Sequence, residues 1–181
     1  MGRLIFVTGG QRSGKSAFAE DLCKRYADVT YIATGMALDA EMKSRINAHR
    51  ARRSASWKTV EAALDASGAA AAADSECVLI DSVSSLVTNI MYQYPPDDEP
   101  TAEQRAGISG RVSGETDRLI QAIRASNAVF VVVSDETGMG LISEYAHGRL
   151  FCDLLGRANQ ALAQSSDEAY LLVSGLPLRL R

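Results

Sequence analysis

The chain has 181 residues and a mass of 19.4 kDa, with 46% apolar and 23% charged residues. These values are ordinary for a folded protein with a buried core, and they exclude a disordered or fibrous chain. The formal net charge of −3 argues against a protein that coats DNA or RNA. The length suits one domain, and we expect residues 1–181 to form it.

Continuous apolar runs predict β-strands that are covered on both faces of a sheet. These runs are residues 4–8, 29–33, 77–81, 128–134 and 169–174. Helical patterns alternate with them, at residues 15–26, 39–53, 61–73, 83–92, 111–126 and 144–164. This alternation predicts an α/β fold with a mostly parallel sheet.

Two other segments have distinct patterns. Residues 94–116 contain three prolines, three glycines and an acidic cluster, which predicts a long loop. Residues 175–181 alternate after a Val-Ser-Gly sequence, which predicts an antiparallel edge strand that closes a C-terminal hairpin.

The cysteines and the N-terminus indicate the compartment. Cys23, Cys77 and Cys152 are odd in number and lie outside any C-x-x-C spacing, so they predict neither a disulfide framework nor a zinc site. The N-terminal apolar run is too short for a signal peptide, and no stretch reaches the roughly 18 uncharged apolar residues of a membrane span. We therefore expect a cytoplasmic protein without a membrane span.

A glycine-rich loop follows the first predicted strand and precedes a predicted helix. Its sequence fits the phosphate-binding pattern G-x-x-x-x-G-K-[ST], and we call it the P-loop. The P-loop comprises Gly9, Gly10, Gln11, Arg12, Ser13, Gly14, Lys15 and Ser16. Its backbone N–H groups would surround phosphate oxygens, Lys15 would reach the β- and γ-phosphates, and the Ser16 hydroxyl would bind Mg²⁺. A glycine turn that carries Lys-Ser by chance is the alternative.

Carboxylates are expected at the same edge of the sheet, where parallel strands end. Asp81 ends the third apolar run and would hold Mg²⁺ together with Ser16, although it could instead cap the next helix. Glu136 follows the fourth run and would face the same crevice. Its neighbour Asp135 is expected to be a turn residue.

The net charge conceals a local excess of bases. Lys43, Arg45, Arg50, Arg52, Arg53 and Lys58 form a basic cluster without any acid, which leaves a net charge of −9 on the rest of the chain. On a helix over residues 39–53, His49 shares one face with Arg45 and Arg53. Neighbouring bases would favour a neutral imidazole and could bind a triphosphate beside it. A structural role for His49 is the alternative, and His147 is expected to be structural.

Several segments together resemble one family. They are residues 8–16, 31–34, 87–89, 138–140, 156–157, 159–160 and 173–175, with Asp39, Glu41, Met42, Arg45, Ile46, His49, Arg53, Trp57, Glu61, Glu136, Phe151 and Asp153. Nearly end to end, the chain is similar to the bifunctional adenosylcobinamide kinase / adenosylcobinamide-phosphate guanylyltransferases of cobalamin biosynthesis. It departs from that pattern at Ser54, Thr137, Ala146 and Cys152.

The resemblance implies a three-layer, RecA-like P-loop NTPase fold and two reactions. A nucleoside triphosphate first phosphorylates the hydroxyl of adenosylcobinamide's side arm. GTP then reacts with the phosphorylated product to give adenosylcobinamide-GDP and pyrophosphate, through a guanylylated histidine that matches His49. The resemblance also implies Mg²⁺, GTP and ATP, nucleotide contacts from Thr34, Arg53 and Glu61, and a homotrimer.

Two other classes of function remain open. A plain small-molecule P-loop kinase would use the basic cluster as a lid over ATP and would form no nucleotidyl product. A nucleotide-dependent switch would bind nucleotide and hydrolyse it only with a partner.

Overall fold

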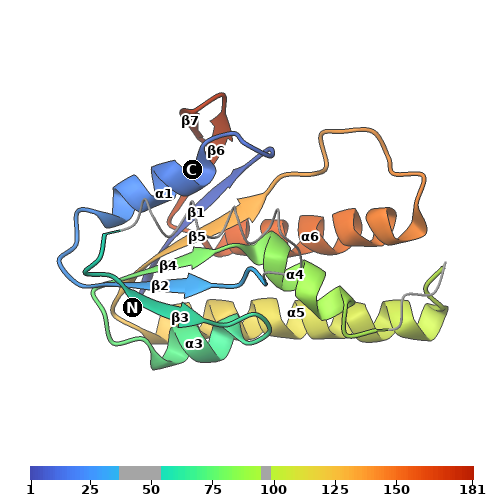
Figure 1. The fold of residues 1–181 in the computed structure, drawn as a ribbon, viewed down its shortest axis with the longest axis horizontal. Coiled ribbons are helices and arrows are strands. Elements are labelled where there is room, and N and C mark those ends of the chain that lie inside the picture. Colours follow the sequence, from blue (N-terminus) through green and yellow to red (C-terminus); the bar gives the residue numbers. More distant parts are fainter. Residues whose placement is uncertain (37–53, 95–98) are drawn as a thin grey trace.

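The computed structural model describes residues 1–36, 54–94 and 99–181. A seven-stranded sheet, with strand order β3-β2-β4-β5-β1-β6-β7, runs through this part of the chain (Figure 1). Its strands are β1 (Arg3–Gly9), β2 (Val29–Ala33), β3 (Lys58–Glu61), β4 (Cys77–Asp81), β5 (Val129–Asp135), β6 (Glu168–Val173) and β7 (Leu176–Arg179). The pairs are parallel except for β6 with β7, which is antiparallel.

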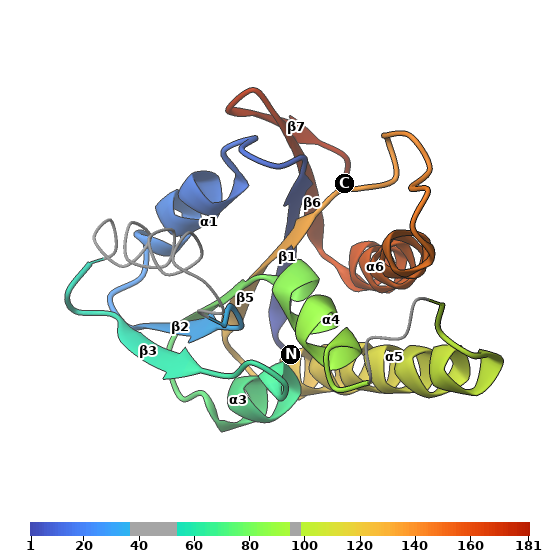
Figure 2. The ribbon, with the colours of Figure 1, turned by 45° about the vertical axis from the view of Figure 1, so that its right-hand side comes forward.

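Helices cover both faces of the sheet (Figure 2). Helix α1 (Lys15–Cys23) packs on one face. The other face is covered by α3 (Ala66–Ala72), α4 (Val83–Met91), α5 (Ala102–Ala125) and α6 (Ala146–Ser165). Successive strand residues point to opposite faces, so the single apolar run of β1 contributes to both cores. The structure confirms the predicted α/β fold with layers on both faces of a mostly parallel sheet.

The predicted strands agree closely with the structure. β2 and β4 have the predicted limits, and β1, β5 and β6 differ from prediction by one residue at each end. The C-terminal hairpin is also confirmed, because Val173 pairs with Leu176 across a turn of two residues. Ser174 and Gly175 occupy that turn with φ of 51° and 83°, the left-handed region that tight hairpin turns use.

The predicted helix over residues 61–73 is wrong at its start. Lys58–Glu61 instead forms β3, an edge strand of exposed residues that pairs in parallel with β2. Because β3 buries no side chain, its sequence contains no apolar run to mark it. Helix α3 begins only after Asp65, whose side chain accepts a hydrogen bond from the backbone N–H of Gly68.

The loop predicted over residues 94–116 is wrong from residue 102 onwards. Helix α5 begins at Ala102, nine residues before the predicted helix start. A capping box starts it, in which the side chains of Thr101 and Gln104 each accept a hydrogen bond from the other's backbone N–H. Gly107 lies against Tyr94, since an added Cβ would come 3.2 Å from the tyrosine hydroxyl oxygen. Helix packing and capping therefore outweigh the glycine content of this segment.

The three cysteines are free thiols in different surroundings. Cys23 and Cys77 are fully buried, with their sulfur atoms 3.6 Å apart, and Cys152 is half-buried. The hydrogen bond from Cys77 and burial raise the pKa of the Cys23 thiol, which keeps it neutral. Among the described residues, no helix has the length and apolar character needed to cross a membrane. The predicted helix over residues 39–53 lies outside the described residues.

Candidate active site

The P-loop connects β1 to α1 as predicted. β1 ends at Gly9, and α1 begins at Lys15 after the N-cap residue Gly14, whose φ is 94°. Gly9 has no room for a side chain, because an added Cβ would lie 2.6 Å from the Ser13 hydroxyl oxygen and 2.7 Å from the carbonyl oxygen of Leu172. Gly14 is therefore required by its left-handed backbone conformation, and Gly9 by the close packing around it.

Two backbone hydrogen bonds fasten the P-loop to neighbouring strand ends. The N–H of Gly175, in the β6–β7 turn, donates to the carbonyl of Ser13 at 2.9 Å. The N–H of Glu136, which follows β5, donates to the carbonyl of Gly9 at 2.9 Å. The C-terminal hairpin thus supports the P-loop, and Glu136 lies at the same edge of the sheet as the P-loop.

Lys15 is a buried cation at this edge of the sheet. Its side chain is only 10% exposed, and its Nζ donates to the carbonyl of Gly10 at 3.0 Å. The same Nζ lies 2.5 Å from Oδ1 of Asp135, whose side chain is 34% exposed. Ser84, in the first turn of α4, donates a hydrogen bond to the other oxygen, Oδ2. An ammonium group has three donors, so Gly10 and Asp135 account for two of them.

Asp135 belongs to the candidate site by its contact with Lys15, which the sequence did not predict. It is the last residue of β5 and pairs in register with Gly9, so the expectation of a turn residue is wrong. The Nδ2 group of Asn159 in α6 also donates to the Asp135 carbonyl at 2.9 Å. The sequence contained a signal for Asp135, because this residue stands at the end of a continuous apolar run just as Asp81 does.

Asp81 lies at the carboxyl end of β4, as predicted, and is half-buried. The hydroxyl of Tyr31, a buried residue of β2, donates to its Oδ2 at 2.9 Å. The carboxylate of Asp81 and the hydroxyl of Ser16 are hard oxygen donors of the kind that Mg²⁺ prefers. The donor set at this edge therefore fits a magnesium ion.

A buried polar network joins the end of β2 to α4. The Thr34 side chain is fully buried; its hydroxyl donates to the carbonyl of Ser82 and accepts from the Ser82 N–H, both at 2.7 Å. Asn89 in α4 donates to the carbonyls of Thr34 at 2.7 Å and Ala63 at 2.8 Å. The network fixes the point where the chain leaves β2 beside Asp81.

The other predicted site residues lie in different places. The Glu136 carboxylate accepts from the N–H of Gly138 at 2.8 Å, within its own turn. Glu61 ends β3, and the strands β2, β4 and β5 lie between it and β1, so the structure does not bring it to the P-loop. That separation is about 19 Å at a strand spacing of about 4.8 Å. His49 and Arg53 lie outside the described residues.

A parallel sheet with a glycine loop between β1 and α1, and a lysine at the start of that helix, defines a P-loop nucleotide-binding protein. A family model for "Cobinamide kinase / cobinamide phosphate guanyltransferase" matches residues 5–180. The chain belongs to this family, which is named for transferases.

Curated relatives are similar over almost their whole lengths. The chain is 39% identical to the bifunctional adenosylcobalamin biosynthesis protein CobU of Escherichia coli, covering 98% of this chain and 99% of the relative. It is 37% identical to CobU of Salmonella typhimurium, with the same coverage. It is 35% identical to the bifunctional protein CobP of Pseudomonas aeruginosa, covering 97% of this chain and 95% of that protein.

Proposed function

We propose that this protein carries out two successive transfers in cobalamin biosynthesis. A nucleoside triphosphate phosphorylates the side-arm hydroxyl of adenosylcobinamide, and GTP then donates GMP to the phosphate formed, releasing pyrophosphate and giving adenosylcobinamide-GDP. The observation that carries this proposal is the family match over residues 5–180, which includes a P-loop with a buried lysine.

The P-loop is the proposed triphosphate site. Lys15 and the backbone N–H groups of the loop neutralise charge on the phosphates, and the positive end of α1 adds to this effect. Ser16 and Asp81 would hold Mg²⁺, which neutralises charge on the phosphates when it is bound. The contact between Tyr31 and Asp81 orients the Asp81 carboxylate for this role.

His49 is the proposed nucleophile of the second transfer. A neutral imidazole nitrogen attacks the α-phosphorus of GTP, pyrophosphate leaves, and the cobinamide phosphate then takes the guanylyl group from the histidine. The basic cluster around His49 supports this role. Thr34, three residues before residue 37, lies beside the candidate metal site, because its N–H donates to the carbonyl of Asp81 at 3.2 Å.

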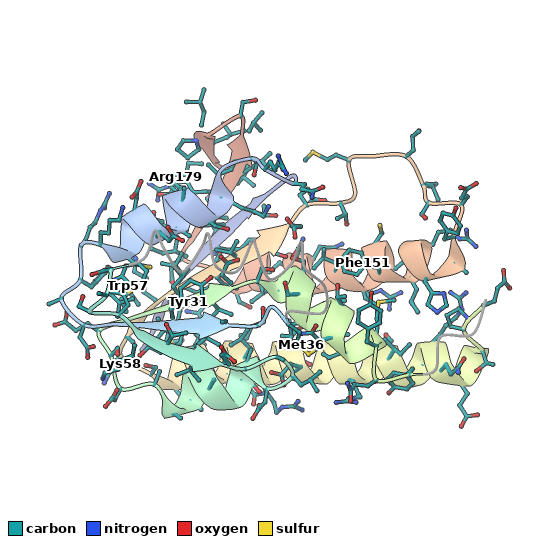
Figure 3. All side chains as sticks on the ribbon, viewed as in Figure 1. Tyr31, Met36, Trp57, Lys58, Phe151 and Arg179 are labelled. Atoms are coloured by element: carbon teal, nitrogen blue, oxygen red, sulfur yellow. The ribbon has the colours of Figure 1, made fainter. Side chains whose placement is uncertain are left out.

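Further nucleotide contacts are proposed for Arg53 and, away from the P-loop, for Glu61, with GTP and ATP as the substrates. Figure 3 shows Met36 near the carboxyl end of β2 and Trp57 at the opposite end of the sheet. The buried Thr34 hydroxyl makes two hydrogen bonds with the backbone of Ser82. We therefore propose that Thr34 affects nucleotide binding indirectly, by positioning the backbone.

Assembly and compartment form part of the same proposal. We infer a single domain over residues 1–181 that associates as a homotrimer in the cytoplasm. The exposed leucines in and just after the C-terminal strand, Leu176, Leu178 and Leu180, offer an apolar edge for association. Free thiols at Cys23, Cys77 and Cys152 agree with a reducing compartment. Light scattering of the purified protein measures the oligomeric state.

The histidine mechanism is tested with GTP labelled at the α-phosphorus. Wild-type protein should retain acid-labile, base-stable label, and His49→Ala should retain none. His147→Ala is the matched control and should label like the wild type. Unlabelled wild-type protein would contradict the histidine mechanism, and full γ-phosphoryl transfer without any nucleotidyl product would instead support a plain kinase.

A further inference from the structure

The two proposed transfers differ in whether the attacking group must lose a proton. In the first, the attacking group is an alcohol, which must lose a proton as it bonds to phosphorus. In the second, a neutral imidazole nitrogen and then a phosphate oxygen attack, and neither nucleophilic atom carries a proton that it must lose as it bonds to phosphorus. A general base is therefore required by the phosphoryl transfer alone.

Asp135 is placed to be that base. Its Oδ1 lies 2.5 Å from Nζ of Lys15, the group that contacts the β- and γ-phosphates in a P-loop. A phosphate oxygen on the same ammonium would lie about 3 Å from Nζ. The carboxylate would then be about 5 Å from the transferring phosphoryl group, which leaves room for one alcohol oxygen between them.

The carboxylate is held in position yet remains open to a substrate. Ser84 binds Oδ2, Lys15 binds Oδ1, and Asn159 fixes the backbone carbonyl of the same residue. A carboxylate has about four acceptor sites, so each oxygen keeps a second lone pair beside these contacts. One third of the side chain is exposed, which gives an alcohol access.

The neighbouring carboxylates are less suited to this role. Glu136 is bound within its own turn by the N–H of Gly138. Asp81 is bound by Tyr31 and is the proposed metal ligand. Among the described residues, Asp135 is the carboxylate that contacts Lys15.

We propose that Asp135 is the general base of the phosphoryl transfer, an assignment that rests on the proposed function. Its carboxylate takes the proton of the corrinoid side-arm alcohol as that oxygen bonds to the γ-phosphorus of the nucleoside triphosphate. The bond between the γ-phosphorus and the β,γ-bridging oxygen breaks, and the nucleoside diphosphate leaves with the electron pair. Asp135 then releases the proton to solvent. Guanylyl transfer does not use this carboxylate.

The test compares both transfers in Asp135→Asn. Phosphoryl transfer is measured with γ-labelled ATP and cobinamide, and guanylyl transfer is measured separately with α-labelled GTP and cobinamide phosphate supplied ready-made. We expect kcat for phosphoryl transfer to fall by about 10²–10⁴-fold. Guanylyl transfer should stay within about 3-fold of wild type, which also shows that the variant is folded. Asp135→Glu retains a carboxylate and should recover part of the lost rate.

Asp74→Asn is the matched control, since it breaks a Lys–Asp pair at the other end of the sheet. It should leave both rates unchanged. The assignment is overturned if Asp135→Asn keeps its phosphoryl-transfer rate. It is also overturned if both transfers fall together, because Asp135 would then only position Lys15. Wild-type protein that does not phosphorylate cobinamide would contradict the proposed function instead.

Discussion

Two Lys–Asp pairs at opposite ends of the sheet have the same chemistry and different surroundings. Lys15 and Asp135 are 2.5 Å apart, with side chains 10% and 34% exposed. Lys58 and Asp74 are 3.1 Å apart, with side chains 54% and 84% exposed. Water and salt screen the second pair, whereas protein surrounds most of the first. We therefore expect the loss of one charge to change both the transfer rates and the free energy of unfolding in the Lys15–Asp135 pair only.

The largest expected effect comes from removing the buried ammonium. Lys15→Ala should lower both phosphoryl and guanylyl transfer by at least about 100-fold, because charge on the triphosphate loses its main side-chain partner. Lys58→Ala should keep both rates within about 2-fold, although its side chain belongs to the basic cluster. Initial rates with labelled ATP and GTP measure both effects. Equal losses of the transfer rates in the two variants would contradict the proposed difference between the two Lys–Asp pairs.

The two pairs should also differ in their contribution to folding. Asp135→Ala leaves the Lys15 ammonium largely shielded and without its carboxylate, which should lower the free energy of unfolding by about 1–2 kcal/mol after allowance for the exposed part of Asp135. Asp74→Ala should cause no measurable change at physiological salt. Urea unfolding of both variants measures these changes. Equal losses in the free energy of unfolding would mean that burial does not distinguish the two pairs.

A smaller effect is expected from the group that orients Asp135. Ser84→Ala removes the hydrogen bond to Oδ2, and phosphoryl transfer should fall by about 3–10-fold while guanylyl transfer is unchanged. Ser85→Ala is the matched control, because Ser85 lies beside Ser84 in α4 and its hydroxyl lies 3.2 Å from that of Ser82. Similar losses of phosphoryl transfer in the two serine variants would contradict a specific role of Ser84 in orienting Asp135.

The smallest effect concerns pH at the exposed pair. The hydrogen bond and charge of Lys58 hold the pKa of Asp74 below its ordinary value of 3.8. Such a carboxyl adds stability above its unfolded pKa, and this contribution is lost as the pH falls through the folded pKa. At low salt, wild type should melt slightly above Asp74→Asn at pH 7. The difference should vanish in strong acid and in 1 M salt. Thermal unfolding under these conditions checks it.

The sequence predicted the elements that bury apolar side chains. Continuous runs marked β2 and β4 to the residue, because both faces of these strands are covered. β3 was missed because its residues are all exposed. The start of α5 was missed because glycines and prolines suggested a loop, while a capping box and tertiary packing decided the structure.

The site was predictable where a local motif marks it. The loop between β1 and α1 was predicted from its glycine spacing and from the strand and helix that flank it, and the position of Asp81 from the end of an apolar run. The binding roles of these residues stay predictions. Asp135 satisfied the same strand-end rule, and its contact with Lys15 joins residues 120 positions apart, which no local pattern reports. Tyr31 and Asn89 have roles that likewise depend on which strands and helices lie side by side.

The most direct test of the central claim follows both transfers into one product. Wild-type protein is incubated with adenosylcobinamide, ATP labelled at the γ-phosphorus and GTP labelled at the α-phosphorus, and the corrinoid product is isolated. We expect a single product that carries both labels, since the phosphate from ATP and the GMP from GTP are joined in it. A product that carries the γ-label alone would contradict the account and would make the protein a kinase only.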